Sequence, residues 1–360
     1  MITTGVVFQT ENISVVHTPG TRSDVVAVTF TPLQHKEISP PEGFAQRFFE
    51  KRGIPSVCFV SHWDHWWQVN EMEQALNVAR AVTSNYRRVM TYGTSMGGYG
   101  ALAYSGKLDA TEVVAFSPQY SIDGQKVPFE TRWRRHADRL SFENDSMDTG
   151  LRQNANILLG YDPDTLDGLH VQKIKANNAR HLKVPMIGHG VIAYLNATGV
   201  LGPILTAAAD GNINVDPYMQ IIHDKRQEWP AHWISLADDA LAKESLHEAV
   251  NFLQRAIALE PNSFSTTIKL ARTYERLKDV ENAAIWYPKA FDLRPSDKYA
   301  QEKAIRFLSS TARSRLRDGL FEEALKKARL AVTVDPENDD MAELAKRATT
   351  LVKRSGRDIG

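Results

Sequence analysis

Short apolar runs, separated by stretches with helical spacing, fill the first 210 residues of the chain. Seven of these runs predict strands: residues 13–17, 24–30, 54–60, 88–92, 111–116, 156–160 and 184–187. Between them, residues 43–52 and 71–85 predict helices. Strands that alternate with helices predict an α/β fold, in which helices cover both faces of a doubly wound, mainly parallel sheet.

From about residue 230 the strand pattern stops and a repeat begins. Pro261 and Pro295 are 34 residues apart, which is the period of a tetratricopeptide repeat. Small and large residues recur where two packed helices need them: Trp233, Leu236, Ala237, Ala249, Leu253 and Ala256, then Leu270, Ala271, Tyr274, Ala283, Tyr287 and Ala290. The pattern predicts an all-α domain of helical hairpins, and a hairpin array without repeat ancestry is the alternative.

A third copy of the repeat ends at Pro336, 41 residues after Pro295. It therefore carries seven extra residues around 296–302, in a longer helix or a loop. Residues 338–353 predict a polar capping helix, which the end of a solenoid needs. We expect three parts: an α/β domain at 1–210, a linker at 211–229, and about three tetratricopeptide repeats with a capping helix at 230–360.

Composition narrows the classes of function. Lysine and arginine number 43 among the 360 residues, and aspartate and glutamate also number 43, so no bulk charge favours nucleic acid or an acidic membrane. The single cysteine, Cys58, excludes an internal disulfide. The sequence shows no secretion signal and no apolar stretch long enough to span a membrane. We expect a cytoplasmic protein.

The segment Gly93-Thr94-Ser95-Met96-Gly97 carries the strongest chemical signal. An apolar, β-prone segment precedes it and a segment that can begin a helix follows, which is the setting in which G-x-S-x-G exposes a nucleophilic serine. The helix directs its first N–H groups to the same place, where they can stabilise negative charge. Ser95 is therefore a predicted nucleophile; the alternative is a tight turn whose serine only caps the helix.

With this motif and strand order, residues 10–205 resemble the α/β-hydrolase family. In that family an acid and then a histidine follow the serine, each in a loop after a later strand. Here Tyr161-Asp162-Pro163-Asp164 and Gly188-His189-Gly190 occupy such loops. The resemblance implies Ser95 as nucleophile, His189 as the base that takes its proton, and Asp162 as the acid that orients the imidazole, with Asp164 and Asp167 as alternatives for the acid.

Stabilising the oxyanion of such a reaction takes two hydrogen-bond donors. Met96, directly after the nucleophile, supplies one backbone N–H by its position. The second donor is expected in the loop after strand 24–30, which lacks the usual His-Gly pattern. Pro32 has no N–H, so Thr31 is predicted and Leu33 is the alternative.

The loop His62-Trp63-Asp64-His65-Trp66-Trp67 follows strand 54–60, at the edge of the sheet where ligands bind. Trp63, Trp66 and Trp67 are predicted to bind substrate, as a stacking floor for a sugar ring or an acyl group. The alternative is that these rings pack the domain or contact the repeats. No further ligand cluster supports a metal at His62, Asp64 and His65, so we expect neither metal nor cofactor.

Residues 118–155 form a predicted lid-like insertion between nucleophile and acid. It carries Trp133 and a basic group: Arg132, Arg134, Arg135, His136 and Arg139. This group could bind an anionic part of a substrate. The favoured interpretation is a solvated helix face paired with Glu130, Asp138 and Glu143.

Together these features predict a serine hydrolase that cleaves an ester through an acyl-enzyme, as a carboxylesterase does. The repeats would bind a protein or peptide partner, or part of a large substrate. Acyl transfer to, or deacylation of, a glycan or glycoprotein is the alternative within enzymes. A protein-interaction scaffold with an inactive site is the alternative of another class.

Overall fold

The computed structural model of the chain describes residues 4–33 and 40–355. The chain divides into two compact units, Met1–Arg226 and Gln227–Gly360. The interval expected to be a linker contains three short helices, η2 (Asp216–Tyr218), α9 (Met219–Asp224) and η3 (Lys225–Glu228). Most of this interval belongs to the first unit, and Tyr194 holds it there through a hydrogen bond to the Ile222 carbonyl oxygen.

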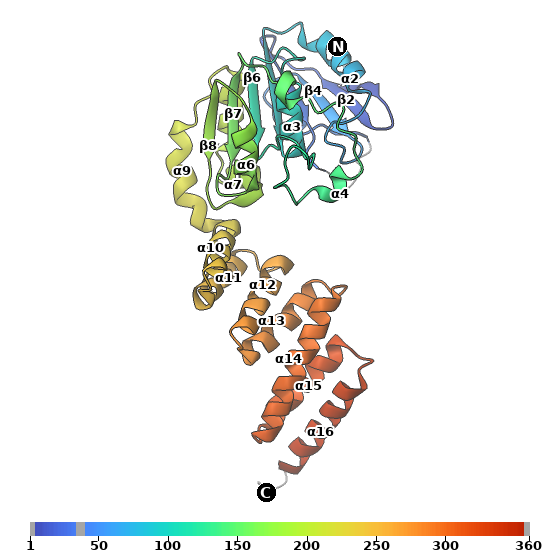
Figure 1. The fold of residues 1–360 in the computed structure, drawn as a ribbon, viewed down its shortest axis with the longest axis vertical. Coiled ribbons are helices and arrows are strands. Elements are labelled where there is room, and N and C mark those ends of the chain that lie inside the picture. The colour runs from blue at the N-terminus through green and yellow to red at the C-terminus, as the bar shows by residue number, and fades with distance from the viewer. Residues whose placement is uncertain (1–3, 34–39, 356–360) are drawn as a thin grey trace. The chain divides into compact units, whose positions relative to one another are not determined.

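The first unit is built on an eight-stranded sheet of order β1-β2-β4-β3-β5-β6-β7-β8 (Figure 1). Its strands are β1 (Gly5–Gln9), β2 (Ile13–Thr18), β3 (Val25–Phe30), β4 (Ser56–Ser61), β5 (Arg88–Thr94), β6 (Glu112–Phe116), β7 (Asn156–Tyr161) and β8 (Ala179–Lys183). The strands from β4 to β8 in this order are parallel, whereas β1 and β2 pair antiparallel. The expected mainly parallel α/β sheet is confirmed.

The two edges of the sheet differ from the strands expected at sequence level. The last strand is β8, and the apolar run 184–187 that was expected to form it is the loop that follows. The edge strand β1 was not expected at all. Both edge strands expose most of their side chains, so neither needs the apolar run by which a central strand is recognised.

Helices cover both faces of the sheet. Thr91 of β5 donates a hydrogen bond to the Ala101 carbonyl of α3, while the ring of its neighbour Tyr92 contacts Phe49 of α1. Neighbouring residues of a strand point to opposite faces, so α1 and α3 lie on opposite faces. The helices of this unit up to residue 209 are α1 (Gln46–Glu50), α2 (Met72–Thr83), α3 (Met96–Ala103), α4 (Arg134–Ala137), α5 (Met147–Gly150), α6 (Leu166–Lys173), η1 (Gly188–Gly190), α7 (Val191–Ala197) and α8 (Leu201–Ala209).

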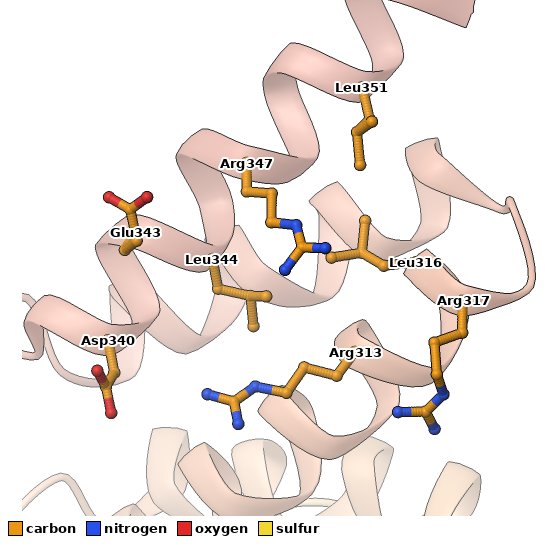
Figure 2. A pocket seen from close by; sticks show the side chains of 8 residues that line it. All are labelled: Arg313, Leu316, Arg317, Asp340, Glu343, Leu344, Arg347 and Leu351. Atoms are coloured by element: carbon orange, nitrogen blue, oxygen red, sulfur yellow. The ribbon is translucent and has the colours of Figure 1, made fainter.

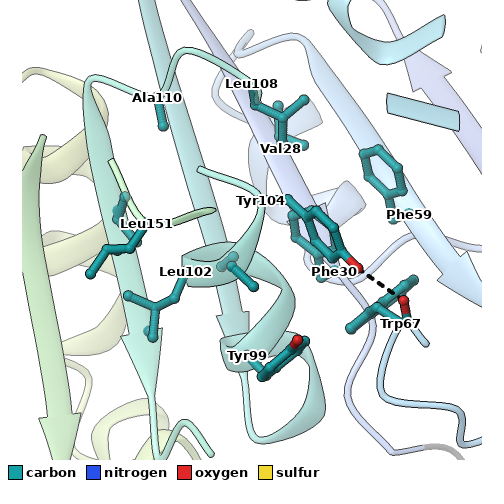
Figure 3. Packing of buried hydrophobic residues seen from close by; sticks show 14 of the residues in the cluster. Val28, Phe30, Phe59, Trp67, Tyr99, Leu102, Tyr104, Leu108, Ala110 and Leu151 are labelled. Carbon is teal, nitrogen blue, oxygen red and sulfur yellow. Dashed lines mark hydrogen bonds between the residues drawn. The ribbon is translucent and has the colours of Figure 1, made fainter. Parts of the chain in front are cut away.

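On the face of the sheet covered by α3, large apolar side chains form one continuous core (Figure 3). The rings of Phe30 and Phe59 stack 4.7 Å apart, and the edge of Trp67 meets the ring of Phe30. The hydroxyl of Tyr104 in this cluster donates a hydrogen bond of 2.9 Å to the Trp67 carbonyl oxygen, drawn as a dashed line in Figure 3. This bond ties the loop after β4 to the helix that follows Ser95.

The second unit is a run of paired helices, as expected. They are α10 (Pro230–Ala242), α11 (Leu246–Leu259), α12 (Phe264–Arg276), α13 (Val280–Leu293), α14 (Lys298–Arg317), α15 (Phe321–Val334) and α16 (Asp339–Ser355). Small residues at the repeat positions are buried between them, among them Ala237, Ala271, Ala290 and Ala331. Helix α14 has 20 residues, whereas α10 and α12 have 13 each, so the seven extra residues lengthen a helix.

Within the described ranges, no single helix is long and apolar enough to cross a membrane. One bent pair, Gly188–Ala197 with Leu201–Ala209, passes that test by length and composition alone.

Candidate active site

Ser95 lies in a strained turn between β5 and α3. Its backbone φ of 54° and ψ of −123° are unusual for a residue with a side chain, and its N–H is held by the Phe116 carbonyl of β6 at 2.9 Å. The flanking glycines have no room for a Cβ atom, which would lie 2.1 Å from the Gly97 carbonyl oxygen at position 93 and 2.3 Å from the Phe30 carbonyl oxygen at position 97. The predicted strand, turn and helix around the serine are confirmed.

His189 reaches the serine from the short helix η1, after the last strand. Its Nε2 atom lies 3.0 Å from the Oγ of Ser95. The Oγ of Ser117 donates a hydrogen bond of 3.0 Å to the His189 carbonyl oxygen and fixes the backbone there. The His189 side chain is 34% exposed, so the imidazole is partly open to solvent, whereas Ser95 is buried. The structure brings Ser95 and His189 together as the sequence predicted.

The carboxylate partner of His189 is Asp167. Its Oδ2 atom lies 2.7 Å from the Nδ1 of His189, and the residue is fully buried in the first turn of α6. The prediction that Asp162 takes this place is wrong. The Oδ2 of Asp162 accepts hydrogen bonds from the N–H groups of Ile187 and Gly188, at 2.8 and 2.7 Å, so Asp162 shapes the loop that carries His189.

The insertion at 118–155 supplies a guanidinium to this carboxylate. Arg132 donates to the Oδ1 of Asp167 at 2.8 Å and forms a bidentate ion pair with Glu130. Glu130 in turn accepts a hydrogen bond from the Nε2 of His170 at 2.9 Å. The expected pairing of the basic group with Glu130 is thus observed at Arg132, but the second partner of Arg132, Asp167, belongs to the serine–histidine site.

Burial and pairing act in opposite directions on these carboxylates. Burial alone raises the pKa of Asp167, but the hydrogen bond to His189 and the charge of Arg132 outweigh burial, so the net shift is downward. Burial also raises the pKa of Glu130, but the hydrogen bonds to His170 and Arg132 and the charge of Arg132 have the larger effect. The net result is a pKa lowered to about 2. Both carboxylates are therefore charged at neutral pH and hold Arg132 between them.

The backbone N–H of Thr31, predicted as an oxyanion donor, is already engaged. It donates a 3.1 Å hydrogen bond to the Phe59 carbonyl of the neighbouring strand, so the prediction for Thr31 is wrong. Met96 begins α3, and the first N–H groups of a helix have no partner within it. A donor that the sequence did not indicate lies close by: the Nε2 of Gln119 is 3.4 Å from the Oγ of Ser95.

The three tryptophans do not form a stacking floor. Trp66 and Trp67 are buried, at 1% and 0% exposure, and the indole N–H of Trp67 donates to the Met96 carbonyl oxygen at 2.9 Å. Trp63 is 41% exposed but hydrogen-bonded to Asn12. The loop therefore packs the domain, which was the alternative expectation. Among the described residues, no group of histidine, cysteine and carboxylate side chains is arranged to hold a metal.

Comparisons with known proteins add likenesses of fold. No protein-family model and no curated protein matches the chain. The capsule O-acetyltransferase of Neisseria meningitidis serogroup A, in a structure of a mutant in complex with CoA, is 14% identical, with 54% of this chain and 93% of that chain covered and a TM-score of 0.38. An α/β serine hydrolase without a lid from Xanthomonas campestris is 13% identical over 54% of this chain and 87% of its own, with a TM-score of 0.34. The TPR domain of Arabidopsis OM64 is 20% identical over 34% of this chain and 96% of its own, with a TM-score of 0.22. The first half is thus similar to α/β-hydrolase folds and the last third to a TPR domain.

Proposed function

We propose that this protein is a serine hydrolase that cleaves an ester through an acyl-enzyme. One observation carries the proposal: a strained serine, an imidazole and a buried carboxylate form an unbroken line of contacts, with 3.0 Å from Ser95 to His189 and 2.7 Å from His189 to Asp167. A turn that costs backbone strain persists only where the surrounding structure maintains it, and such strain clusters at active sites. A scaffold with an inactive site would have no need of this arrangement.

In the proposed reaction the proton of Ser95 moves to His189 while Oγ attacks the ester carbonyl carbon. With its Nδ1–H donated to Asp167, His189 presents an unprotonated Nε2 to the hydroxyl, which is the tautomer that a base needs. Asp167 stabilises the imidazolium that forms. His189 then gives the proton to the leaving alcohol, and a water molecule repeats the sequence to release the acid.

A fluorophosphonate probe tests the proposal directly. Wild-type protein is expected to be labelled on Ser95 and to hydrolyse p-nitrophenyl esters, and Ser95→Ala is expected to lose both properties. Ser61→Ala is the matched control, because Ser61 is also buried but bonds to Thr31, and it should be labelled like wild type. Wild-type protein that is folded but resists the probe would favour the scaffold, and turnover by Ser95→Ala equal to wild type would contradict the proposal.

Acyl transfer is separated from hydrolysis in the same assay. The alternative of a glycan acceptor drew part of its support from the tryptophan-rich loop, and two of the three tryptophans of that loop, Trp66 and Trp67, are buried. Addition of a sugar alcohol to the ester reaction is therefore expected to leave the rate of acid release unchanged. Formation of the sugar ester in its place would make the protein an acyltransferase with the same nucleophile.

For the repeat unit we propose an acidic peptide segment as the partner. A cavity of about 450 Å³ lies between α14 and α16, lined by three exposed arginines, Arg313, Arg317 and Arg347 (Figure 2). None of the three forms an ion pair with another residue in the described part of the chain. Leu316 and Leu344 lie between them, and Asp340 and Glu343 occupy only one end in Figure 2. Positive charge around an apolar floor suits a chain of carboxylates with apolar neighbours.

Binding of a fluorescent glutamate-rich peptide tests this partner. We expect Arg347→Glu to weaken binding by about tenfold or more, because it reverses a charge at the centre of the cavity, and added salt to weaken it further. Arg329→Glu, on the exposed face of α15 outside the cavity, is the matched control and should bind as wild type does. Equal binding of a lysine-rich peptide, or an equal loss in both variants, would contradict the proposal.

A further inference from the structure

An attacked ester places negative charge on its carbonyl oxygen, and the chain must present donors to that oxygen. The first N–H of α3, at Met96, lies next to the nucleophile. The N–H of Thr31 is taken by the Phe59 carbonyl. The side chain of Gln119, in the loop after β6, lies at the serine instead.

The orientation of the Gln119 amide follows from its two other neighbours. Its Oε1 accepts a 3.2 Å hydrogen bond from the indole N–H of Trp66, a group that can only donate. Its Nε2 donates at 3.3 Å to the Ser117 carbonyl, a group that can only accept. Exchanging the two ends would place like groups against each other at both contacts. The Nε2 therefore faces the Oγ of Ser95, at 3.4 Å.

The surroundings of Gln119 hold it rigidly in this orientation. The residue is fully buried, and Trp66, which fixes its Oε1, is 1% exposed. Trp66 packs against Trp133 and His136 of the insertion, with ring centroids 5.5 and 5.4 Å apart. A donor that is already held in place costs no reorganisation when charge develops beside it.

We propose that the Nε2–H of Gln119 is the second oxyanion donor of this site, opposite the backbone N–H of Met96. The inference rests on the proposed hydrolase function. When Oγ bonds to the acyl carbon, the electron pair of the C=O double bond moves to the carbonyl oxygen and the serine proton moves to His189. Gln119 and Met96 then donate to that oxygen, until the C–O bond to the leaving alcohol breaks and the double bond forms again. Trp66 is a positioning residue in this scheme, because it acts only through the amide.

Substitution of Gln119 is expected to lower kcat for p-nitrophenyl acetate about 10² to 10³-fold, with KM changed by about threefold or less, since the lost bond forms only with the developing charge. Gln119→Met fills a similar volume without a donor, and Gln119→Glu keeps an acceptor for Trp66 but puts a carboxylate beside the oxyanion. Both variants should also react more slowly with a fluorophosphonate. Trp66→Phe frees Oε1 and should lower kcat by about tenfold, less than loss of the amide itself.

Gln68→Ala is the matched control. This second glutamine amide also contacts the loop of Trp66, through the Trp66 carbonyl, and bonds to Tyr99, but no hydrogen bond joins it to Ser95. Its kcat should stay near that of wild type, and circular dichroism shows whether each variant is folded. The inference would be overturned if wild-type protein is active and both Gln119→Met and Gln119→Glu keep its kcat, with at most a change in KM. That outcome would leave the proposed hydrolase function standing. A wild type without probe labelling or turnover would instead overturn the proposed function.

Discussion

Asp167→Asn is expected to lower kcat for ester hydrolysis about 10⁴-fold, the loss that accompanies a wrong imidazole tautomer. Arg132 explains why the loss should be this large. Its guanidinium donates to the Oδ1 of Asp167, so it would hold the oxygen of the new amide on its own side. The NH₂ group would then face His189 and donate to Nδ1. The imidazole proton would move to Nε2, where it prevents acceptance of the Ser95 proton.

Asp162→Asn tests the aspartate that the sequence favoured as the acid over Asp164 and Asp167. The asparagine oxygen can still accept from the N–H groups of Ile187 and Gly188, although without the strength of a charged acceptor, but its NH₂ group loses the hydrogen bond that Oδ1 of Asp162 accepts from the Asp164 N–H. We expect kcat within about tenfold of wild type and a free energy of unfolding lowered by about 1 to 2 kcal/mol. Steady-state kinetics and urea unfolding of both variants measure these quantities. A 10⁴-fold loss at Asp162 with little loss at Asp167 would contradict the assignment of the acid.

The pairing of Ser95 with His189 could be predicted because both residues leave a local signature. The serine lies in a pentapeptide in which Gly93 and Gly97 are required for steric reasons. A Cβ atom at these positions would lie only 2.1 and 2.3 Å from backbone carbonyl oxygens. The histidine lies between glycines after the last strand. The acid left no comparable signature, since three aspartates, Asp162, Asp164 and Asp167, follow β7 within one short segment. Asp167 is held by Thr165, whose side chain caps α6, so the residue serves both the start of the helix and His189.

The remaining site residues depend on contacts that no spacing reveals. Gln119 and Trp66 lie 53 residues apart and meet only in the folded chain. The tryptophan-rich loop shows the same limit, because a cluster of aromatic rings has equal composition whether it covers a ligand or fills a core. The burial of Trp66 and Trp67 in the structure shows that these two rings fill the core. The repeat was easier to predict, since each helix buries its alanines against its neighbours in sequence.

Acidification from about pH 6.5 to pH 4 is expected to remove about 3 kcal/mol of stability through His65 alone, because the pKa of His65 in the folded protein is about 4. Burial lowers the pKa of His65 to about 4, despite the opposing effects of its hydrogen bond to the Asn12 backbone and of the charge of Glu71. The neutral ring is fully bonded, with the Trp67 N–H donating to Nδ1 at 3.0 Å and Nε2 3.2 Å from the Asn12 carbonyl oxygen. A proton on Nδ1 would displace the first of these bonds.

Stability falls on acidification because, as the pH falls, His65 of the unfolded chain binds a proton at a higher pH than His65 of the folded chain does. The stabilisation is complete above the unfolded pKa and is lost as the pH falls through the folded pKa of about 4. The paired carboxylates of Glu130 and Asp167 have lowered pKa values, so their contribution is lost only at more acid pH.

Urea unfolding between about pH 6.5 and pH 4 should therefore show a steep loss of unfolding free energy in wild type and a flatter loss in His65→Gln, because glutamine cannot take up the proton. Burial also lowers the pKa of His17 and His181, and both variants share that contribution, so the difference between the two curves isolates His65. If the unfolding free energies of wild type and His65→Gln fall in parallel with pH, then protonation of His65 does not destabilise the folded protein, and the prediction is contradicted.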